Sequence, residues 1–157
     1  MNRIAFNENW TCNGELVTLP HDAMIEEKRS AQFSDGGHAY FPGGIYIYEK
    51  RFLAPKEWEN KEVFLELEGV YRNATVYLNE EKVYFHAYGY TGFFVPLTKL
   101  NIGKENVLKV VADNSKLPNS RWYTGSGIYR PVWLHICERG GLSPESVKIT
   151  TVSAVPA

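Results

Sequence analysis

Residues 63–79 read VFLELEGVYRNATVYLN and contain two runs in which apolar and polar residues alternate. Successive side chains of a β-strand point to opposite faces, so a period of two indicates a strand with one buried face. The side chains expected to face the core are Val63, Leu65, Leu67, Ala74, Val76 and Leu78. Those expected to face outward are Phe64, Glu66, Glu68, Thr75, Tyr77 and Asn79. The stretch therefore predicts two neighbouring half-buried strands.

The same period recurs along most of the chain, outside these two runs. Further strands are predicted in the runs at 15–19, 45–53, 107–113, 132–137 and 147–152. Turn-forming clusters such as FPGG and NIGKEN divide the runs, and only EEKRSAQ, at 26–32, offers one or two helical turns. So many short strands in one chain predict an all-β fold, a jelly-roll β-sandwich of antiparallel strands.

Length and charge limit the possible classes of protein. A chain of 157 residues is expected to form a single domain, 1–157. With 17 basic and 18 acidic residues well mixed, no basic face argues for nucleic acid. The sequence has no apolar run of about 18 residues that would argue for a membrane span, and MNRIAFNENW lacks the apolar centre of a secretion signal. A cytoplasmic location is expected, or a secreted or periplasmic one if a leader peptide has been removed.

The two cysteines, Cys12 and Cys137, lie far apart and have no metal-ligand spacing. Two reduced thiols are expected, although a disulfide remains open. His21 has no second histidine at a metal-ligand spacing, so no metal site is predicted.

Several motifs occur together and in a fixed order. EGVYRNATVYLN (68–79), VLKVVADNS (107–115) and RWYTGSGIYRPVWL (121–134) together resemble the amino-terminal sugar-binding domain of glycoside hydrolase family 2, in particular its bacterial β-galactosidase-like members. LPHDAMIEE (19–27) fits the same pattern, so the resemblance covers nearly the whole chain. Where the family usually has Asn-Gly after the second alternating run, this chain has Asn79-Glu80. We therefore expect a longer loop through Glu81 in place of a two-residue turn.

The resemblance implies a galactose-binding-like jelly roll within a larger, bacterial, multidomain glycosidase. In that family the domain packs against a (β/α)8 barrel, usually with immunoglobulin-like domains between them, and the catalytic pair of glutamates belongs to the barrel. Such a barrel takes about 250 residues and cannot lie in this chain. No cofactor is implied.

The carboxylates of the chain itself offer no substitute for that pair. A retaining mechanism needs two carboxyl groups about 5 Å apart. Glu26/Glu27 and Glu80/Glu81 are adjacent in sequence, would point apart in an extended chain, and are expected on the surface. The chain alone is expected to lack catalytic residues, although its parent is expected to be a β-galactosidase or β-glucuronidase.

The resemblance also directs attention to the long loop between Asp113 and Pro131. Sugars are recognised by aromatic rings that stack on C–H groups and by side chains that hydrogen-bond hydroxyls. Arg121, Trp122, Asp113 and Asn114 offer this chemistry and are the candidate substrate-binding residues, with Asp22 from the other long loop. The structural alternatives are that Trp122 covers a sheet edge, that Arg121 pairs with an acid, and that Asp22 caps a turn.

Other side chains of the same types are assigned to structure. Gly125 and Gly127 are expected to supply positive φ or close backbone approach, and Arg130 to form a structural ion pair. Aromatic residues at alternate strand positions are more often sheet packing than a binding stripe. That interpretation is applied to most of Tyr46, Tyr48, Tyr84, Tyr88 and Tyr90.

Two functions from different classes remain. The preferred one is a non-catalytic domain of a retaining exo-glycosidase that docks the barrel and helps to shape the subsite for the terminal β-linked sugar, with galactose preferred. The rival is a free-standing carbohydrate-binding module, and a purely structural sandwich is a third possibility. The expected partners are carbohydrate, the barrel and the immunoglobulin-like domains of the parent, and another copy of the chain in a homo-oligomer.

Overall fold

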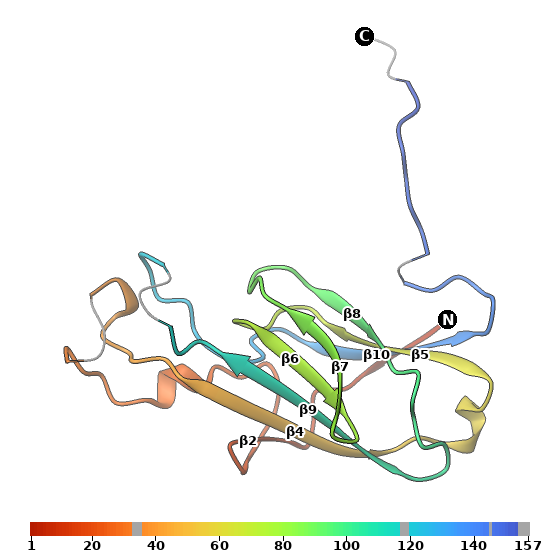
Figure 1. Cartoon of the computed structure of the whole chain (residues 1–157), viewed down its shortest axis with the longest axis horizontal. Helices are drawn as coiled ribbons and strands as arrows, with labels where there is room; N and C mark the ends of the chain where they lie inside the picture. The colour runs from red at the N-terminus through yellow and green to blue at the C-terminus, as the bar shows by residue number, and fades with distance from the viewer. Residues whose placement is uncertain (33–35, 117–119, 145, 154–157) are drawn as a thin grey trace.

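The computed structural model describes residues 1–32, 36–116, 120–144 and 146–153 and shows an antiparallel β-sandwich (Figure 1). The all-β prediction is confirmed. The strands are β1 (Asn2–Ala5), β2 (Trp10–Cys12), β3 (Glu15–Val17), β4 (Ile45–Leu53), β5 (Lys61–Leu67), β6 (Ala74–Leu78), β7 (Glu81–His86), β8 (Phe93–Pro96), β9 (Glu105–Asp113) and β10 (Val132–Glu138). Short 3-10 helices are η1 (Ala23–Glu26), η2 (Gly36–His38) and η3 (Lys56–Trp58). None of the described helices is long and apolar enough to cross a membrane.

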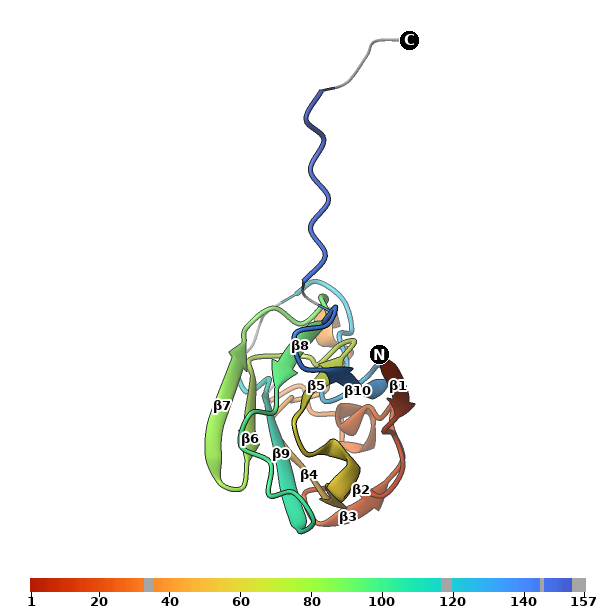
Figure 2. The ribbon, with the colours of Figure 1, turned by 90° about the vertical axis from the view of Figure 1, so that its right-hand side faces the viewer.

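The strands form two layers. One sheet has four strands in the order β1-β10-β5-β8, and the other has six in the order β3-β2-β4-β9-β6-β7. Figure 2 shows the six-stranded sheet curving around one side of the four-stranded sheet. Within both sheets of the described chain, the paired strands run antiparallel. Cys12 and Cys137 lie in different sheets, and both are buried free thiols.

The core lies between the layers and is built from the faces that the alternation predicts. The inward residues expected in 63–79 are all buried: Val63, Leu65, Leu67, Ala74, Val76 and Leu78. The alternate positions of β9 and β10 are buried as well: Leu108, Val110, Ala112, Val132, Leu134 and Ile136. Because burial of apolar area stabilises a fold by about 25 cal/mol per Å², these alternating faces fix the register of the strands.

The hairpin between β6 and β7 corrects one expectation. Leu78 pairs with Glu81, so the turn has two residues, Asn79 and Glu80, and the expected longer loop is wrong. Both turn residues have positive φ, 49° and 69°, as a turn of type I′ requires. The side chain of Asn79 accepts a hydrogen bond from the Val107 N–H at 2.9 Å and donates one to Asn106 at 2.9 Å. These anchors hold the tight turn in place without a glycine.

The predicted strand at 147–152 is also wrong. Residues 146–153 run away from the sandwich as an extended segment (Figures 1 and 2). Val147, Ile149 and Val152 are 64%, 91% and 96% exposed. Alternation shows that a segment could bury one face, but a strand forms only where another strand pairs with it, and no described residue pairs with this one. The helical turn expected within 26–32 is replaced by η1, which ends at Glu26.

Gly127 fills a place that only glycine fits. Its φ is 111°, and a Cβ built on it would lie 2.0 Å from the phenol oxygen of Tyr48. Tyr48 is fully buried and its hydroxyl lies 2.9 Å from Nδ1 of His21, so it has little freedom to move. The chain before β10 therefore approaches the six-stranded sheet closely at this point.

Gly127→Ala should lower the free energy of unfolding by about 3 kcal/mol or more, because the new methyl group clashes with Tyr48 and the backbone is strained. Gly14→Ala is the matched control, since Gly14 has a φ of 93° but no atom within 4 Å of the added Cβ. It should cost only about 1–2 kcal/mol, the backbone penalty alone. Urea unfolding measures both, and equal losses would contradict the clash with Tyr48.

Glu80→Gly should raise the free energy of unfolding by about 0.5–1 kcal/mol, because glycine adopts the left-handed conformation of the β6–β7 turn without a steric penalty. Glu80→Ala removes the same charge but keeps the penalty, so it should leave stability within about 0.5 kcal/mol of the parent chain. Thermal unfolding of the two variants checks this, and a glycine variant no more stable than the alanine variant would contradict it.

Candidate functional site

The two longest irregular segments of the chain leave the six-stranded sheet at the same place. Ile45, the first residue of β4, pairs with Asp113, the last residue of β9. The described parts of the segments before β4 and after β9 therefore extend from the same end of the sandwich, as the orange-brown and cyan loops in Figure 1 show. Any site built from both long loops must lie at this end.

The stem of the second loop, at 125–128, is held on two sides by main-chain hydrogen bonds. On one side, Ala23 N–H donates to the Ser126 carbonyl at 2.9 Å and His21 N–H donates to the Ile128 carbonyl at 2.8 Å. On the other side, Gly127 and Tyr71 exchange two hydrogen bonds, of 2.7 and 2.9 Å. The stem is thus fixed like a short strand between two segments that are distant in sequence.

Asp22 fixes the same loop through its side chain. Its Oδ1 accepts hydrogen bonds from the N–H of Met24 at 3.1 Å, which caps η1, and from the N–H of Ser126 at 2.9 Å. Its Oδ2 accepts a 2.5 Å hydrogen bond from the Tyr123 hydroxyl. Burial, and then the bond to Asp22, raises the pKa of the Tyr123 phenol, which therefore stays protonated and keeps donating. The cap named as the structural alternative for Asp22 is present.

Asn114 and Asp113 lie at the base of the loop. Asn114 is fully buried, and its Nδ2 donates to Oγ of Ser126 at 2.7 Å. The Asp113 carboxylate accepts hydrogen bonds from the N–H and hydroxyl of Ser115, at 3.0 and 2.6 Å, and these bonds hold the pKa of Asp113 below its usual value. Both side chains therefore hold the loop in place: Asn114 bonds its far end at Ser126, and Asp113 bonds its first residues at Ser115.

Arg121 and Trp122, in contrast, lie on the surface. Trp122 is 59% exposed, and its indole N–H donates to the Tyr90 hydroxyl at 2.9 Å. The Arg121 side chain is exposed and forms no ion pair or hydrogen bond with a residue in the described ranges. The ion-pair alternative for Arg121 therefore has no partner among those residues.

The ring of Trp122 belongs to a cluster that sequence reasoning missed. Tyr90 packs edge-on against Tyr71 and Tyr88, with ring centroids 5.3 and 5.6 Å apart. Tyr88 and Tyr90 are 60% and 37% exposed, whereas Tyr46 and Tyr48 are buried as sheet packing predicts. The sequence offered one signal for this cluster, the glycine between Tyr88 and Tyr90. The structure explains that glycine, because a Cβ at Gly89 would lie 2.2 Å from the Tyr71 ring. We call Trp122, Tyr88 and Tyr90 the aromatic cluster.

This end of the sandwich offers stacking surfaces and donors rather than acid–base chemistry. The aromatic cluster presents ring faces and phenol groups to solvent, and Arg121 adds a charged, planar donor. Within the described residues, no group of three or more histidine, cysteine, aspartate or glutamate side chains could hold a metal ion. Such an arrangement suits recognition of a polyhydroxylated ring or of another protein surface.

Comparisons with known proteins give consistent relatives. The chain is 42% identical over 121 residues to the β-galactosidase BoGH2A of Bacteroides ovatus, an alignment that covers 76% of this chain and 14% of that protein. It is 34% identical over 142 residues to a putative β-glucuronidase of Formosa agariphila, covering 88% of this chain and again 14% of the relative. No family profile matches. The chain thus spans about a seventh of the length of these curated relatives.

Solved structures show the same relationship. A β-glycosidase from Bacteroides vulgatus matches with a TM-score of 0.80 and 34% identity over 87% of this chain and 20% of that one. A glycosyl hydrolase family 2 member from Bacteroides cellulosilyticus matches with a TM-score of 0.81 and 29% identity over 88% of this chain and 21% of that one. With the motif order and the two-layer fold, these matches identify the chain as a β-sandwich domain of glycoside hydrolase family 2 that spans a small part of each relative.

Proposed function

We propose that the chain is the non-catalytic domain of a retaining exo-glycoside hydrolase, where it docks against the catalytic barrel and completes the subsite for the terminal sugar. The observation that carries the proposal is the contrast within one loop. Asp22, Ser126 and Gly127 hold its stem, while Arg121 and Trp122 at its tip are exposed. A surface tryptophan on a firmly held loop is placed to contact something outside this domain.

Pre-organisation supports a binding role. Ordering a loop upon binding costs free energy, and a loop already held by hydrogen bonds in the free state avoids that cost. The Trp122 ring is also oriented by the hydrogen bond from its indole N–H to the Tyr90 hydroxyl. Stacking on the C–H face of a sugar, together with a hydrogen bond from Arg121 to a hydroxyl, uses both side chains.

The relatives support a glycosidase parent, with galactose and glucuronic acid as the two candidate sugars. A β-galactosidase and several β-glucuronidases are among them, and each is several times longer than this chain. A terminal β-linked galactose is the preferred substrate unit, with glucuronic acid as its competitor. The catalytic glutamates are assigned to the rest of the parent protein.

A free-standing carbohydrate-binding module is the second candidate. The exposed aromatic cluster favours it, because aromatic rings on a β-sandwich can hold a sugar without help from a barrel. The two candidates differ in the affinity of the isolated chain. Half of a subsite should give a binding free energy of no more than about 4 kcal/mol, a dissociation constant near 1 mM, whereas a module that works alone needs tighter binding.

The isolated chain should hydrolyse no chromogenic β-galactoside or β-glucuronide, because the proposal assigns both catalytic glutamates to the rest of the parent protein. It should also bind galactose with a dissociation constant of about 1 mM or weaker. Absorbance assays and calorimetry measure the two quantities. Turnover above buffer would refute the assignment of catalysis to the rest of the parent, and micromolar affinity for a free sugar would favour the module.

In the intact parent enzyme, Arg121→Ala and Trp122→Ala should each lower kcat/KM by roughly ten- to 150-fold, the cost of a lost charge-assisted hydrogen bond or of comparable stacking. The melting temperature should change little, because both side chains are exposed. Steady-state kinetics of each variant measure kcat/KM, and thermal unfolding measures the melting temperature.

Two control variants separate recognition from architecture. Arg51→Ala removes an exposed arginine on β4 that pairs with Glu105 at 2.9 Å, and should change neither quantity appreciably. Asp22→Asn weakens the stem and should lower the melting temperature. If the Arg121 and Trp122 variants behave like Asp22→Asn, with a lower melting temperature and normal kcat/KM in the folded enzyme, the loop is architecture and not a site.

A further inference from the structure

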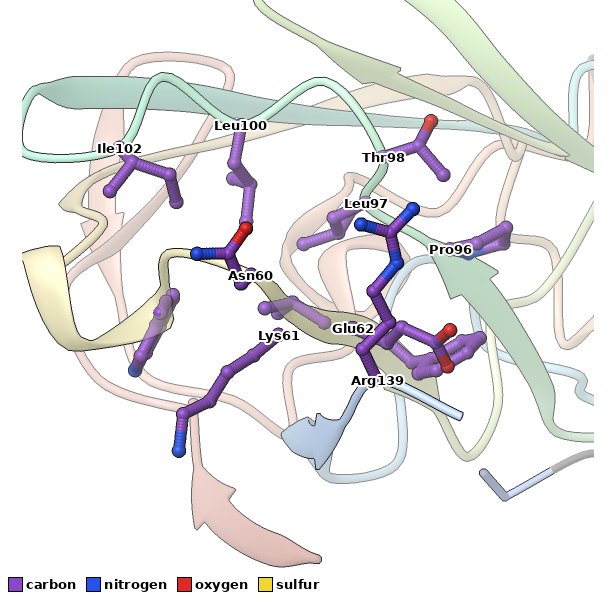
Figure 3. A pocket seen from close by; sticks show the side chains of 12 residues that line it. Asn60, Lys61, Glu62, Pro96, Leu97, Thr98, Leu100, Ile102 and Arg139 are labelled. Carbon is purple, nitrogen blue, oxygen red and sulfur yellow. The ribbon is translucent and has the colours of Figure 1, made fainter. Parts of the chain in front are cut away.

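A groove of about 450 Å³, seen from close by in Figure 3, is lined by residues of both sheets' connecting segments and by the start of β5. It lies at the other end of the sandwich from the aromatic cluster. It is formed by η3, the start of β5 and the segment that follows β8, with Arg139 after β10. Lys61, at the start of β5, pairs with Glu138, whereas Leu67, at its end, pairs with Val132 beside the long loop. The full length of β5 therefore separates the groove from Arg121 and Trp122. Its volume lies in the range of small-ligand sites, about 300–1,000 Å³.

The walls of the groove are apolar. Val63 and Leu97 are buried beneath it, and Leu100 and Trp58 are half-buried and pack against the core. The indole N–H of Trp58 makes no hydrogen bond with a residue that the structure describes. A ligand with an apolar face and a hydrogen-bond acceptor at its edge would match this surface.

The rim carries polar groups that are not engaged by the protein. The side chains of Asn60, Glu62, Thr98 and Arg139 form no hydrogen bond or ion pair within the described ranges. The other rim cation, Lys61, is paired with Glu138 at 2.7 Å and points away from the groove in Figure 3. The guanidinium of Arg139 instead points toward the segment that carries Leu97 and Thr98. The groove thus combines neutral donors, the Glu62 carboxylate and one planar cation, Arg139, that forms no ion pair with a described residue.

We propose that this groove binds a uronic-acid unit of a carbohydrate chain. Arg139 would bind the sugar carboxylate, because a guanidinium matches a carboxylate with two parallel hydrogen bonds. Asn60, Glu62 and Thr98 are donors and acceptors for ring hydroxyls, and Trp58 and Leu100 cover the C–H face. A neutral sugar leaves the charge of Arg139 unused, and a simple anion leaves the apolar walls unused, so the acidic sugar is the ligand that uses both.

The inference does not rest on the proposed function. The groove shares no residue with the aromatic cluster, and binding there would let the chain hold an acidic sugar unit without using Arg121 or Trp122. A negative result for the groove would therefore leave the proposed role of Arg121 and Trp122 unaffected, and the reverse also holds.

The test is a titration of the 157-residue chain with trigalacturonic acid, followed by amide chemical shifts in two-dimensional NMR. Neutral galactotriose is the matched sugar, and sodium acetate is the matched carboxylate. We expect saturable shifts in residues 58–63 and 97–102 with the acidic sugar, and at least about tenfold weaker binding of the other two compounds. A higher salt concentration should weaken the binding of trigalacturonic acid, because the contact of its carboxylate with Arg139 is electrostatic.

Arg139→Gln should weaken the binding of trigalacturonic acid at least about tenfold while the spectrum keeps its dispersion, since the Arg139 side chain is exposed and forms no hydrogen bond or ion pair with a described residue. Arg51→Gln, on β4, is the matched control and should bind like the parent chain. Four results would overturn the proposal: equal binding of galactotriose, equal shifts with acetate, shifts confined to the Trp122 loop, or an Arg139→Gln variant that binds normally. The absence of shifts with every compound would overturn it as well.

Discussion

The carboxylate of Asp22 is the contact on which the long-loop end of the molecule depends. Its two oxygens accept hydrogen bonds from Met24, Ser126 and Tyr123, and so join η1 to a segment about a hundred residues later in the chain. Hydrogen bonds to a charged acceptor are stronger than neutral ones, and they strengthen further when partly buried. Without that carboxylate, the stem would keep its main-chain bonds but lose the link that sets the direction of the tip. The exposure of Arg121 and Trp122 is meaningful because the loop behind them is fixed in this way.

Most of the fold could be predicted from the sequence, because a strand with one buried face must place an apolar residue at every second position. The inward faces of β5, β6, β9 and β10 followed from alternation alone. The wrong predictions for the β6–β7 turn and for residues 147–152 have a different origin. The turn at Asn79-Glu80 is held by side-chain bonds to Asn106 and Val107, which lie on another strand and leave no local signal. The segment at 147–152 alternates like a strand, but alternation carries no information on whether a pairing partner is present.

The candidate site was predictable only in part. The composition of the loop pointed to Arg121 and Trp122, and both are exposed at its tip. The same reasoning grouped Asn114 with them because it is near in sequence, yet its amide is buried against Ser126. Tyr90, which orients Trp122, comes from a loop about thirty residues earlier, and only the three-dimensional fold brings the two together. Sequence can nominate residue types for recognition, but their orientation depends on tertiary contacts.

The two ends of the sandwich offer different chemistry, stacking surfaces at the long-loop end and an apolar groove with Arg139 at its rim at the other. The central claim concerns the long-loop end: Arg121 and Trp122 complete a sugar subsite of a larger enzyme. A crystal structure of the intact parent with a terminal-sugar inhibitor tests it most directly. The account predicts an Arg121 nitrogen within hydrogen-bond distance of a sugar hydroxyl, about 2.7–3.2 Å, and the Trp122 ring in contact with the sugar. Both side chains lying in solvent or against protein, with the sugar elsewhere, would contradict it.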